Sequence, residues 1–439
     1  MYAYIMIDYD LAFNIIVTAS TFMVVFTILL SIYYLTYFFT ARRKVPAIPA
    51  SENYTKFGVI IAARNESKVI RNLFNTLAKQ TYPKEYYDVW IVVESFDDPS
   101  IGIAEEFGYK WFVRDRLTPD RRTKGFALQE ITDYFTRENI LYDAYMIFDA
   151  DNLVEPNFIE LMNNLRQTGV KIGSGYRNFT NANVNWLTAT SSVMFAYMNQ
   201  VTSKGRSYLF HKATLMGTGY FVDRSIIEDA GGWIFTGMTE DIQLTSYSYY
   251  HDVNMRYYPE AVFYDEQSPK FKQVHDQHIR WLAGFFSSRK YLRKCGVFYD
   301  YHKGPKKALM RSEFKLGILP FIIYNIFNAL LLIASLGLAL GATFTRKDPS
   351  MIWRCWGITI YEALCLYLPF VVASLYVIIS ERKKLHMKPL IAIICCTTYF
   401  VFFYDFLWAF LDLGLHKSKR HSWVQIEHTG ATTKEKKHE

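Results

Sequence analysis

The sequence predicts an α/β domain with a largely parallel sheet, set between long apolar helices that cross a membrane. Between about 54 and 301, short apolar runs alternate with amphipathic stretches, the pattern of strands joined by helices. The segments 11–39, 316–345 and 355–380 are almost free of charge and longer than the roughly 20 residues that cross a bilayer. A chain of 439 residues that is 51% hydrophobic and 17% aromatic is also too apolar to be disordered.

The first apolar segment, 11–39, predicts a membrane helix within residues 1–44. A cleaved signal peptide is the alternative, but it would carry positive charge before a shorter apolar core. Here Asp8 and Asp10 precede the segment, whereas Arg42, Arg43 and Lys44 follow it. Because basic residues near membrane ends stay in the cytoplasm, these flanks predict a cytoplasmic middle domain and a multi-pass protein of the plasma membrane.

The C-terminal region 316–415 contains two further predicted spans and one ambiguous segment. The stretch 355–380 has Glu362 as its one charge, whereas 389–415 contains both Asp405 and Asp412. Carboxylates that face lipid are costly. We therefore expect the last segment to lie in the interface or to re-enter the membrane, which keeps the basic tail 416–439 in the cytoplasm.

The net charge of +8 is largely explained by these basic flanks. It favours contact with an anionic lipid surface, and no nucleic-acid motif is visible, so we expect a lipid bilayer and no nucleic acid among the partners. The five cysteines have neither metal-ligand spacing nor a disulfide pattern. We expect them to be packing residues.

The middle domain, 45–270, contains the predicted strands in a clear order. They are expected at 57–62, 89–93, 109–113, 144–148 and 171–174, with helical stretches such as 68–80 between them. Open sheets of this kind bind ligands beyond the carboxyl ends of their strands. The residues directly after each apolar run are therefore the first candidates for a site.

Acidic residues follow three of these strands. Glu66 comes after the first, Glu94 after the second, and Asp149 with Asp151 after the fourth. One acidic loop is usually a turn or a helix cap, but three at one sheet edge predict a site. Two carboxylates one residue apart can hold Mg²⁺ or Mn²⁺ that bridges a diphosphate.

Three motifs resemble those of the family 2 glycosyltransferases with the GT-A fold. Asp149-Ala150-Asp151 is similar to their DxD motif, Thr239-Glu240-Asp241 to TED, and residues 277–281, Gln-His-Ile-Arg-Trp, to QxxRW. With membrane helices on both sides, the chain resembles the processive synthases of cellulose, mixed-linkage glucan, hyaluronan and chitin. The resemblance implies a GT-A domain with a mixed, mostly parallel sheet and a UDP-sugar donor.

The resemblance also suggests how each residue is used. Charge that grows on the leaving diphosphate must be neutralised, by a cation on Asp151 and Asp149 and by the positive charges of Lys124 and Arg280. Asp241 is expected to be the base that deprotonates the acceptor hydroxyl, which inverts an α-linked donor to a β linkage. Glu66 and Glu94 are expected beside the nucleotide, although the pair of aspartates found in many relatives is missing here, which leaves Asp97 as an alternative to Glu94.

The acceptor is expected at a second group of residues, for which plain turns and packing are the alternatives. This group comprises Gly217, Thr218, Gly219, Glu240, Gln277 and Trp281. Glycines permit close approach of the backbone, and the Trp281 ring offers a flat face to a sugar. The segment 271–315 is predicted to form amphipathic helices at the membrane surface. Trp423 and Thr429 in the tail are candidates for gating the site, and an ordinary tail explains them equally well.

The leading hypothesis is a processive inverting β-glycosyltransferase. It would polymerise UDP-glucose into a β-glucan such as cellulose or mixed-linkage (1,3;1,4)-β-glucan and pass the growing glycan chain across the membrane, alone, as an oligomer or with export proteins. A hyaluronan or poly-N-acetylglucosamine synthase and a single-addition polyprenyl-phosphate glycosyltransferase are the alternative enzymes. A non-catalytic membrane transporter or scaffold is the alternative from another class.

Overall fold

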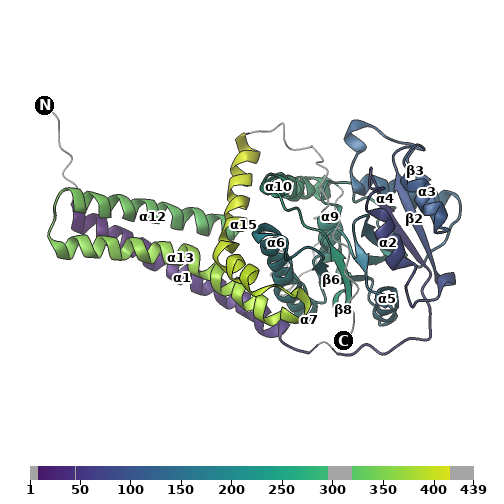
Figure 1. Ribbon diagram of the computed structural model, residues 1–439, viewed down its shortest axis with the longest axis horizontal. Coiled ribbons are helices and arrows are strands. Elements are labelled where there is room, and N and C mark those ends of the chain that lie inside the picture. The colour runs from purple at the N-terminus through teal and green to yellow at the C-terminus, as the bar shows by residue number, and fades with distance from the viewer. Residues whose placement is uncertain (1–7, 45, 295–318, 416–439) are drawn as a thin grey trace.

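The computed structural model describes residues 8–44, 46–294 and 319–415 (Figure 1). Trp423, Thr429, Cys295 and the segment 295–315 lie outside the described residues. The strands are β1 Phe57–Ala62, β2 Tyr87–Val93, β3 Lys110–Val113, β4 Ala144–Asp149, β5 Leu153–Val154, β6 Ile172–Phe179, β7 Tyr220–Asp223 and β8 Met255–Asp265. The helices are α1 Tyr9–Ala41, α2 Ile70–Leu77, η1 Lys84–Tyr86, α3 Ser100–Glu106, η2 Pro119–Arg121, α4 Lys124–Arg137, α5 Phe158–Gln167, α6 Trp186–Tyr197, η3 Met198–Lys204, α7 Gly205–Phe210, α8 Arg224–Asp229, α9 Glu240–Tyr250, α10 Phe271–Lys294, α12 Leu319–Phe344, α13 Pro349–Ser380, α14 Arg382–Leu385 and α15 Pro389–Leu415.

The eight strands form one sheet in the order β3-β2-β1-β4-β7-β6-β8-β5. Strand β1 is parallel to β2 and β4, and β2 is parallel to β3, whereas β7 is antiparallel to both of its neighbours. This confirms the predicted mixed, mostly parallel sheet. Ala62 at the end of β1 is in register with Val92 and with Asp149, so the chain leaves three neighbouring strands at the same sheet edge.

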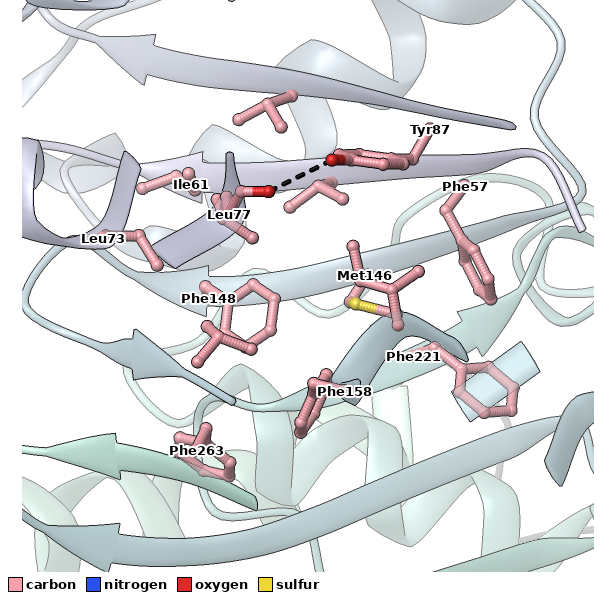
Figure 2. Packing of buried hydrophobic residues seen from close by; sticks show 14 of the residues in the cluster. Phe57, Ile61, Leu73, Leu77, Tyr87, Met146, Phe148, Phe158, Phe221 and Phe263 are labelled. Atoms are coloured by element: carbon pink, nitrogen blue, oxygen red, sulfur yellow. Dashed lines mark hydrogen bonds between the residues drawn. The ribbon is translucent and has the colours of Figure 1, made fainter. Parts of the chain in front are cut away.

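Apolar side chains cover both faces of the sheet. On one face Phe57 and Ile61 of β1 and Phe148 of β4 pack against Leu73 and Leu77 of α2 (Figure 2). The opposite face, which carries Ile60 and Ile147, packs against α4, α8 and α9. Burial on both faces explains why these strands are continuous apolar runs in the sequence.

Helices α1, α12 and α13 pack along one another and project from the α/β domain as a bundle (Figure 1). Together with α15 they are four helices long and apolar enough to cross a membrane. Many of their large apolar side chains are exposed, as expected of lipid-facing surface. Inside the bundle the Ser20 hydroxyl donates to the buried Glu362 carboxylate.

Helix α15 runs across this bundle and lies against α10 and α6 of the α/β domain (Figure 1). It is a single helix of 27 residues without a reversal, whereas a re-entrant segment enters and leaves on one side. Asp405 and Asp412, whose charge argued against a span, are 3% and 8% exposed because they face the protein. This removes the objection from lipid-facing carboxylates, and the interfacial and spanning arrangements both fit the length of the helix.

Candidate active site

The sheet edge where β1, β2 and β4 end brings together charged residues from distant parts of the chain. Asp149 is the last residue of β4, Lys124 is the first of α4, and Glu240 is the first of α9. The Lys124 ammonium donates to Asp149 and, at 2.8 Å, to the carbonyl of Gly217, and it lies 4.0 Å from the Glu240 carboxylate. Lys124 therefore links the turn Asp149-Ala150-Asp151, called the D-A-D turn below, to the start of α9.

The N-terminus of α4 is pinned against the loop that leads into α9. The Thr123 hydroxyl caps α4 by accepting from the Phe126 amide at 3.3 Å, and it donates to the Thr236 carbonyl at 2.8 Å. A Cβ on Gly125 would lie 2.3 Å from the Phe235 carbonyl oxygen. This close approach requires glycine and fixes where Lys124 enters the site.

Buried polar groups hold the D-A-D turn in place through hydrogen bonds. The Asp149 amide donates to Asn152 Oδ1 at 3.1 Å and to the Thr218 hydroxyl at 3.0 Å, and Thr218 in turn donates to Asn152. Thr218 is 1% exposed. Its side chain thus points to the turn of the predicted metal ligands, although we expected the 217–219 segment to face the acceptor.

The two glycines beside Thr218 have different surroundings. A Cβ on Gly217 would lie 3.8 Å from Asp241 Oδ2, whereas a Cβ on Gly219 would lie 2.0 Å from the Phe263 ring. Both have a positive φ, of 84° and 66°. Gly217 therefore borders the predicted base directly, while Gly219 leaves room for the Phe263 ring of β8.

Replacing Thr218 by valine is expected to reduce activity about tenfold and to lower the free energy of unfolding by about 1–3 kcal/mol. The near-isosteric change leaves the buried Asn152 oxygen and the Asp149 amide without this partner. Steady-state rates and chemical denaturation measure the two effects. Thr218→Ser keeps the hydroxyl and is the control; equal losses in both variants would contradict a role for the hydrogen bonds.

Burial raises the pKa of both carboxyls at the start of α9, Glu240 and Asp241, but by different amounts. It raises the pKa of Glu240 to about 8 and that of Asp241 to about 6, while Lys124 opposes both shifts. The Asp241 carboxylate also accepts the Ile242 amide at 2.8 Å, which favours its ionised form. The pKa of Glu240 is thus higher than that of Asp241, so Asp241 ionises first, the division expected of a base beside a structural acid.

The pKa of Asp241 predicts the acid limb of a pH–rate profile. A base acts only when deprotonated, so the rate should fall about tenfold per pH unit below a midpoint of about 6. Rates at saturating substrate between pH 4.5 and 8 measure this midpoint. A profile that stays flat down to about pH 4, the usual range of an aspartate, would contradict the assignment.

The predicted QxxRW residues lie on α10, whose middle faces the same site. Burial lowers the pKa of Arg280, and the charges of Asp149 and Glu240 oppose this shift, so the guanidinium interacts electrostatically with both acids. Gln277 is partly exposed one turn before Trp281. The Trp281 ring packs edge-on to Phe195, with 6.0 Å between ring centroids, so at least part of its surface joins α10 to α6.

Glu94, at the end of β2, is held between two arginines. Its carboxylate lies 3.3 Å from Arg64 and 3.7 Å from Arg114. Asp97 is exposed, and its carboxylate accepts from Ser95, two residues earlier. Glu66 is partly exposed, and its carbonyl accepts two amides at the start of α2. The acidic loops thus emerge together, as expected, and Glu94 already belongs to an ion-pair network.

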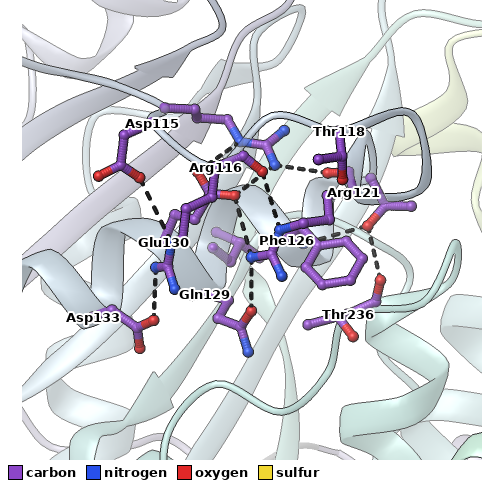
Figure 3. Close-up of polar contacts among 12 residues, drawn as sticks. Asp115, Arg116, Thr118, Arg121, Phe126, Gln129, Glu130, Asp133 and Thr236 are labelled. Carbon is purple, nitrogen blue, oxygen red and sulfur yellow. Dashed lines mark hydrogen bonds and ion pairs between the residues drawn. The ribbon is translucent and has the colours of Figure 1, made fainter.

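The loop 114–123 continues this network beside Glu94 (Figure 3). Arg114 forms a buried ion pair of 2.8 Å with Glu130 of α4. Arg116 lies 2.8 Å from Asp133, and the Arg121 guanidinium lies 4.2 Å above the Phe126 ring. These contacts hold the arginine-rich loop on α4 next to the site.

Arg177 and Asp265 are site residues that the sequence analysis did not identify. The Arg177 guanidinium donates to Asp265 at 2.9 Å and to the Met216 carbonyl at 2.8 Å, beside Gly217. Asp265 also accepts from Asn152 at 3.1 Å. The available signals were an arginine within a buried strand and a carboxylate at the end of β8.

Asp149 and Asp151 provide hard oxygen ligands of the kind that Mg²⁺ and Mn²⁺ prefer. Among the residues that the structure describes, no group of three His, Cys, Asp or Glu side chains could hold a metal. A nucleotide-bound ion needs fewer, since it takes one or two carboxylates together with phosphate oxygens and water. The donor set therefore fits such an ion.

Comparisons with known proteins identify the family of this chain. Residues 55–284 match the family model described as "Glycosyltransferase like family 2". Probable glycosyltransferase YdaM of Bacillus subtilis is 28% identical over 256 residues, which cover 56% of this chain and 60% of YdaM. The poly-beta-1,6-N-acetyl-D-glucosamine synthase of Staphylococcus epidermidis is 22% identical over 62% of this chain and 65% of its own length.

One similarity extends further along the chain. The beta-monoglucosyldiacylglycerol synthase of Trichormus variabilis is 25% identical over 392 residues, which cover 85% of this chain and 76% of that protein. Among solved structures, the mannosyltransferase PcManGT of Pyrobaculum calidifontis, in complex with GDP-Man and Mn²⁺, has a TM-score of 0.55 and 16% identity. The match covers 80% of this chain and 98% of PcManGT and confirms the expected GT-A fold.

Proposed function

The chain belongs to glycosyltransferase family 2, and on that basis we propose that it is a membrane-bound inverting transferase that moves a hexose from a UDP-sugar to an acceptor hydroxyl. The observation that carries this proposal is the meeting of Lys124, Asp149, Glu240 and Asp241 at the carboxyl ends of the strands. One positive group contacts Asp149, a predicted metal ligand, and one carboxylate, Asp241, has a pKa suited to a base.

In the proposed reaction the sugar C1 exchanges one oxygen for another. The acceptor oxygen attacks C1 while the bond from C1 to the diphosphate oxygen breaks, and Asp241 takes the acceptor proton. Lys124 and Arg280 balance the charge that grows on the diphosphate. Asp149 and Asp151 would hold Mg²⁺ or Mn²⁺, which when bound supplies further neutralisation of the diphosphate. Attack opposite the leaving group converts an α-linked donor to a β-linked product.

We propose that the acceptor is the growing end of a β-glucan, with UDP-glucose as the donor. Two facts support a polymerising enzyme: the QxxRW residues lie on the helix that faces the site, and poly-beta-1,6-N-acetyl-D-glucosamine synthase is among the relatives. In the described residues α1, α12 and α13 pack directly on one another. A growing glycan chain would cross the membrane beside these helices, through this chain alone, as an oligomer or with accessory export proteins.

A membrane lipid is the second candidate acceptor. The similarity to beta-monoglucosyldiacylglycerol synthase covers 85% of this chain, whereas that to the polysaccharide synthase covers 62%. The longer match includes much of the membrane region, where a lipid acceptor would reach the site. With this acceptor the product would be a single β-glucosyl lipid instead of a polymer, while the base and the donor site would be the same.

Membrane orientation is part of the proposal. Arg42 and Arg43 after α1 and Arg382 and Lys383 of α14 lie at the end of the bundle that joins the α/β domain (Figure 1). The basic residues at this end support a cytoplasmic catalytic domain, on the side of the membrane where UDP-sugars are made.

The deciding experiment uses the full chain in lipid nanodiscs with radiolabelled UDP-glucose, UDP-N-acetylglucosamine or UDP-glucuronate and Mg²⁺ or Mn²⁺. A high-molecular-weight product from UDP-glucose, cleaved by linkage-specific glucanases, supports the glucan synthase and identifies its linkage. A monosaccharide product that extracts into organic solvent, and grows with added diacylglycerol, supports the glycolipid synthase. Transfer from none of the three donors, with Asp241→Asn as the blank, would overturn the proposal.

A further inference from the structure

A carboxylate of α15 connects the apolar membrane region to the helix that carries the QxxRW residues. Asp405 Oδ1 lies 2.7 Å from His275 Nδ1, and its Oδ2 lies 2.6 Å from His278 Nδ1. Asp405 and His275 are 3% and 8% exposed, and His278 is fully buried. Because an ionised carboxylate only accepts hydrogen bonds, both rings donate their Nδ1 protons to it.

The ring of His278 is fixed on its other sides by aromatic residues. It stacks on Phe406 of α15 with 3.8 Å between centroids and meets the edge of Phe402 at 4.5 Å. Among the described residues His278 Nε2 has no hydrogen-bond partner. A neutral ring with its proton on Nδ1 suits these surroundings, and burial lowers the pKa of His278 in the same direction.

The opposite side of α10 contacts the start of α9, where the predicted base lies. The Thr239 and Ser288 hydroxyls are 3.1 Å apart, and a Cβ on Gly284 would lie 2.4 Å from Thr239 Cγ2. Thr239 directly precedes Glu240 and Asp241. Helix α10 is thus held between α15 and the start of α9, and its Arg280 interacts electrostatically with Asp149 and Glu240.

We propose that Asp405 is a positioning residue for sugar transfer, an inference that rests on the proposed function. His275 and His278 are three residues apart on one face of α10, so two directional hydrogen bonds to one carboxylate fix both the rotation and the axial position of that helix. These two coordinates set the distance of Arg280 from the diphosphate and the packing behind Asp241. Apolar contacts alone would keep α10 and α15 together, but they would oppose sliding of one helix along the other less than directional hydrogen bonds do.

The surroundings of Asp405 support a role in geometry rather than in stability. A carboxylate in an apolar contact costs free energy unless hydrogen bonds compensate for its lost hydration, and an apolar residue could pack α15 on α10 without this cost. The outer surface of α15 is apolar and exposed, for example at Leu390, Ile393, Trp408 and Leu411. Helix α15 would therefore be seated in lipid while Asp405 holds the catalytic helix, which links the bilayer to the site.

The test compares Asp405→Asn with Glu362→Gln in nanodiscs. Asparagine has the same shape but keeps one accepting oxygen, so one histidine loses its acceptor. We expect kcat to fall about 10- to 100-fold, as for a small displacement of catalytic groups, while KM for the UDP-sugar changes less than about threefold. Glu362 is likewise a buried carboxylate in an apolar helix, but it is bonded to Ser20 in the bundle. Its glutamine variant should keep the wild-type kcat.

Hydrogen exchange measured by mass spectrometry gives a second readout that needs no turnover. In Asp405→Asn the amides of 237–244 and 275–284 should exchange faster than in wild type, while those of β1 and β4 stay unchanged. An unchanged kcat with unchanged exchange would overturn the inference, as would an equal increase of exchange throughout the domain. If wild-type protein transfers no sugar, the proposed function fails, and the exchange experiment still decides whether Asp405 positions α10.

Discussion

Asp241→Asn is expected to lower kcat about 10³-fold, within the range seen when a general base is lost. Asparagine keeps the shape of the side chain and can still accept the Ile242 amide, but it cannot take the acceptor proton. Binding of the UDP-sugar should change little because the base faces the acceptor. Single-turnover rates and calorimetric UDP binding with the same preparation separate these two effects.

Glu240→Gln is the matched control for this prediction. The pKa of Glu240 is raised to about 8, so at pH 7 the wild-type side chain is mostly a neutral acid that an amide imitates. We expect a loss of less than about tenfold, since the amide has the shape of the neutral acid and, like it, carries no charge. A loss in Glu240→Gln as large as that in Asp241→Asn would contradict the assignment of the base.

Asp151→Asn is expected to reduce activity about 10³-fold, which corresponds to about 4 kcal/mol of transition-state stabilisation. The amide keeps the contact with Asn152, 3.3 Å away, but loses the charge that would hold Mg²⁺ or Mn²⁺. The dependence of the rate on Mn²⁺ concentration should shift to higher concentrations in the variant. Removal of the metal with EDTA should abolish wild-type activity and be reversed by Mn²⁺.

Asp97→Asn provides the control for charge at the same sheet edge. Asp97 follows β2, is exposed and contacts Ser95 rather than the residues around Lys124. Its asparagine variant should keep the wild-type metal dependence. Equal metal dependence of wild type and Asp151→Asn would exclude Asp151 as a ligand.

Arg177 does not react in the proposed mechanism, but its contacts hold the residues that do. Its guanidinium joins Asp265, the Met216 carbonyl and the face of Phe195, with 4.2 Å to the ring centroid. These contacts place the 216–218 segment beside Asp241 and, through Asp265 and Asn152, support the D-A-D turn. Such buried polar networks hold catalytic groups in place when every member has a partner.

Local sequence was enough to predict β1 to β4, β6 and the long apolar helices, but β5 and β8 were not predicted. The run 57–62 matches β1 at both ends, and 144–148 differs from β4 by one residue. Burial on both faces makes such strands uniformly apolar, so their limits are visible in the sequence. The helix expected over 68–80 is shorter, Ile70–Leu77, because helix ends depend on caps and packing more than on periodicity.

The sequence also identified the acidic edge and the motif residues, because parallel strands deliver their following residues to one side of a sheet. Only the tertiary structure decided which of them meet. Lys124 and Asp149 are 25 positions apart, and Asp405 is 127 positions from His278. No local periodicity encodes such contacts, since they depend on how separate helices pack. The same holds for Thr218, whose hydroxyl braces the D-A-D turn, and for α15, whose two aspartates face the protein although its composition is that of a membrane span.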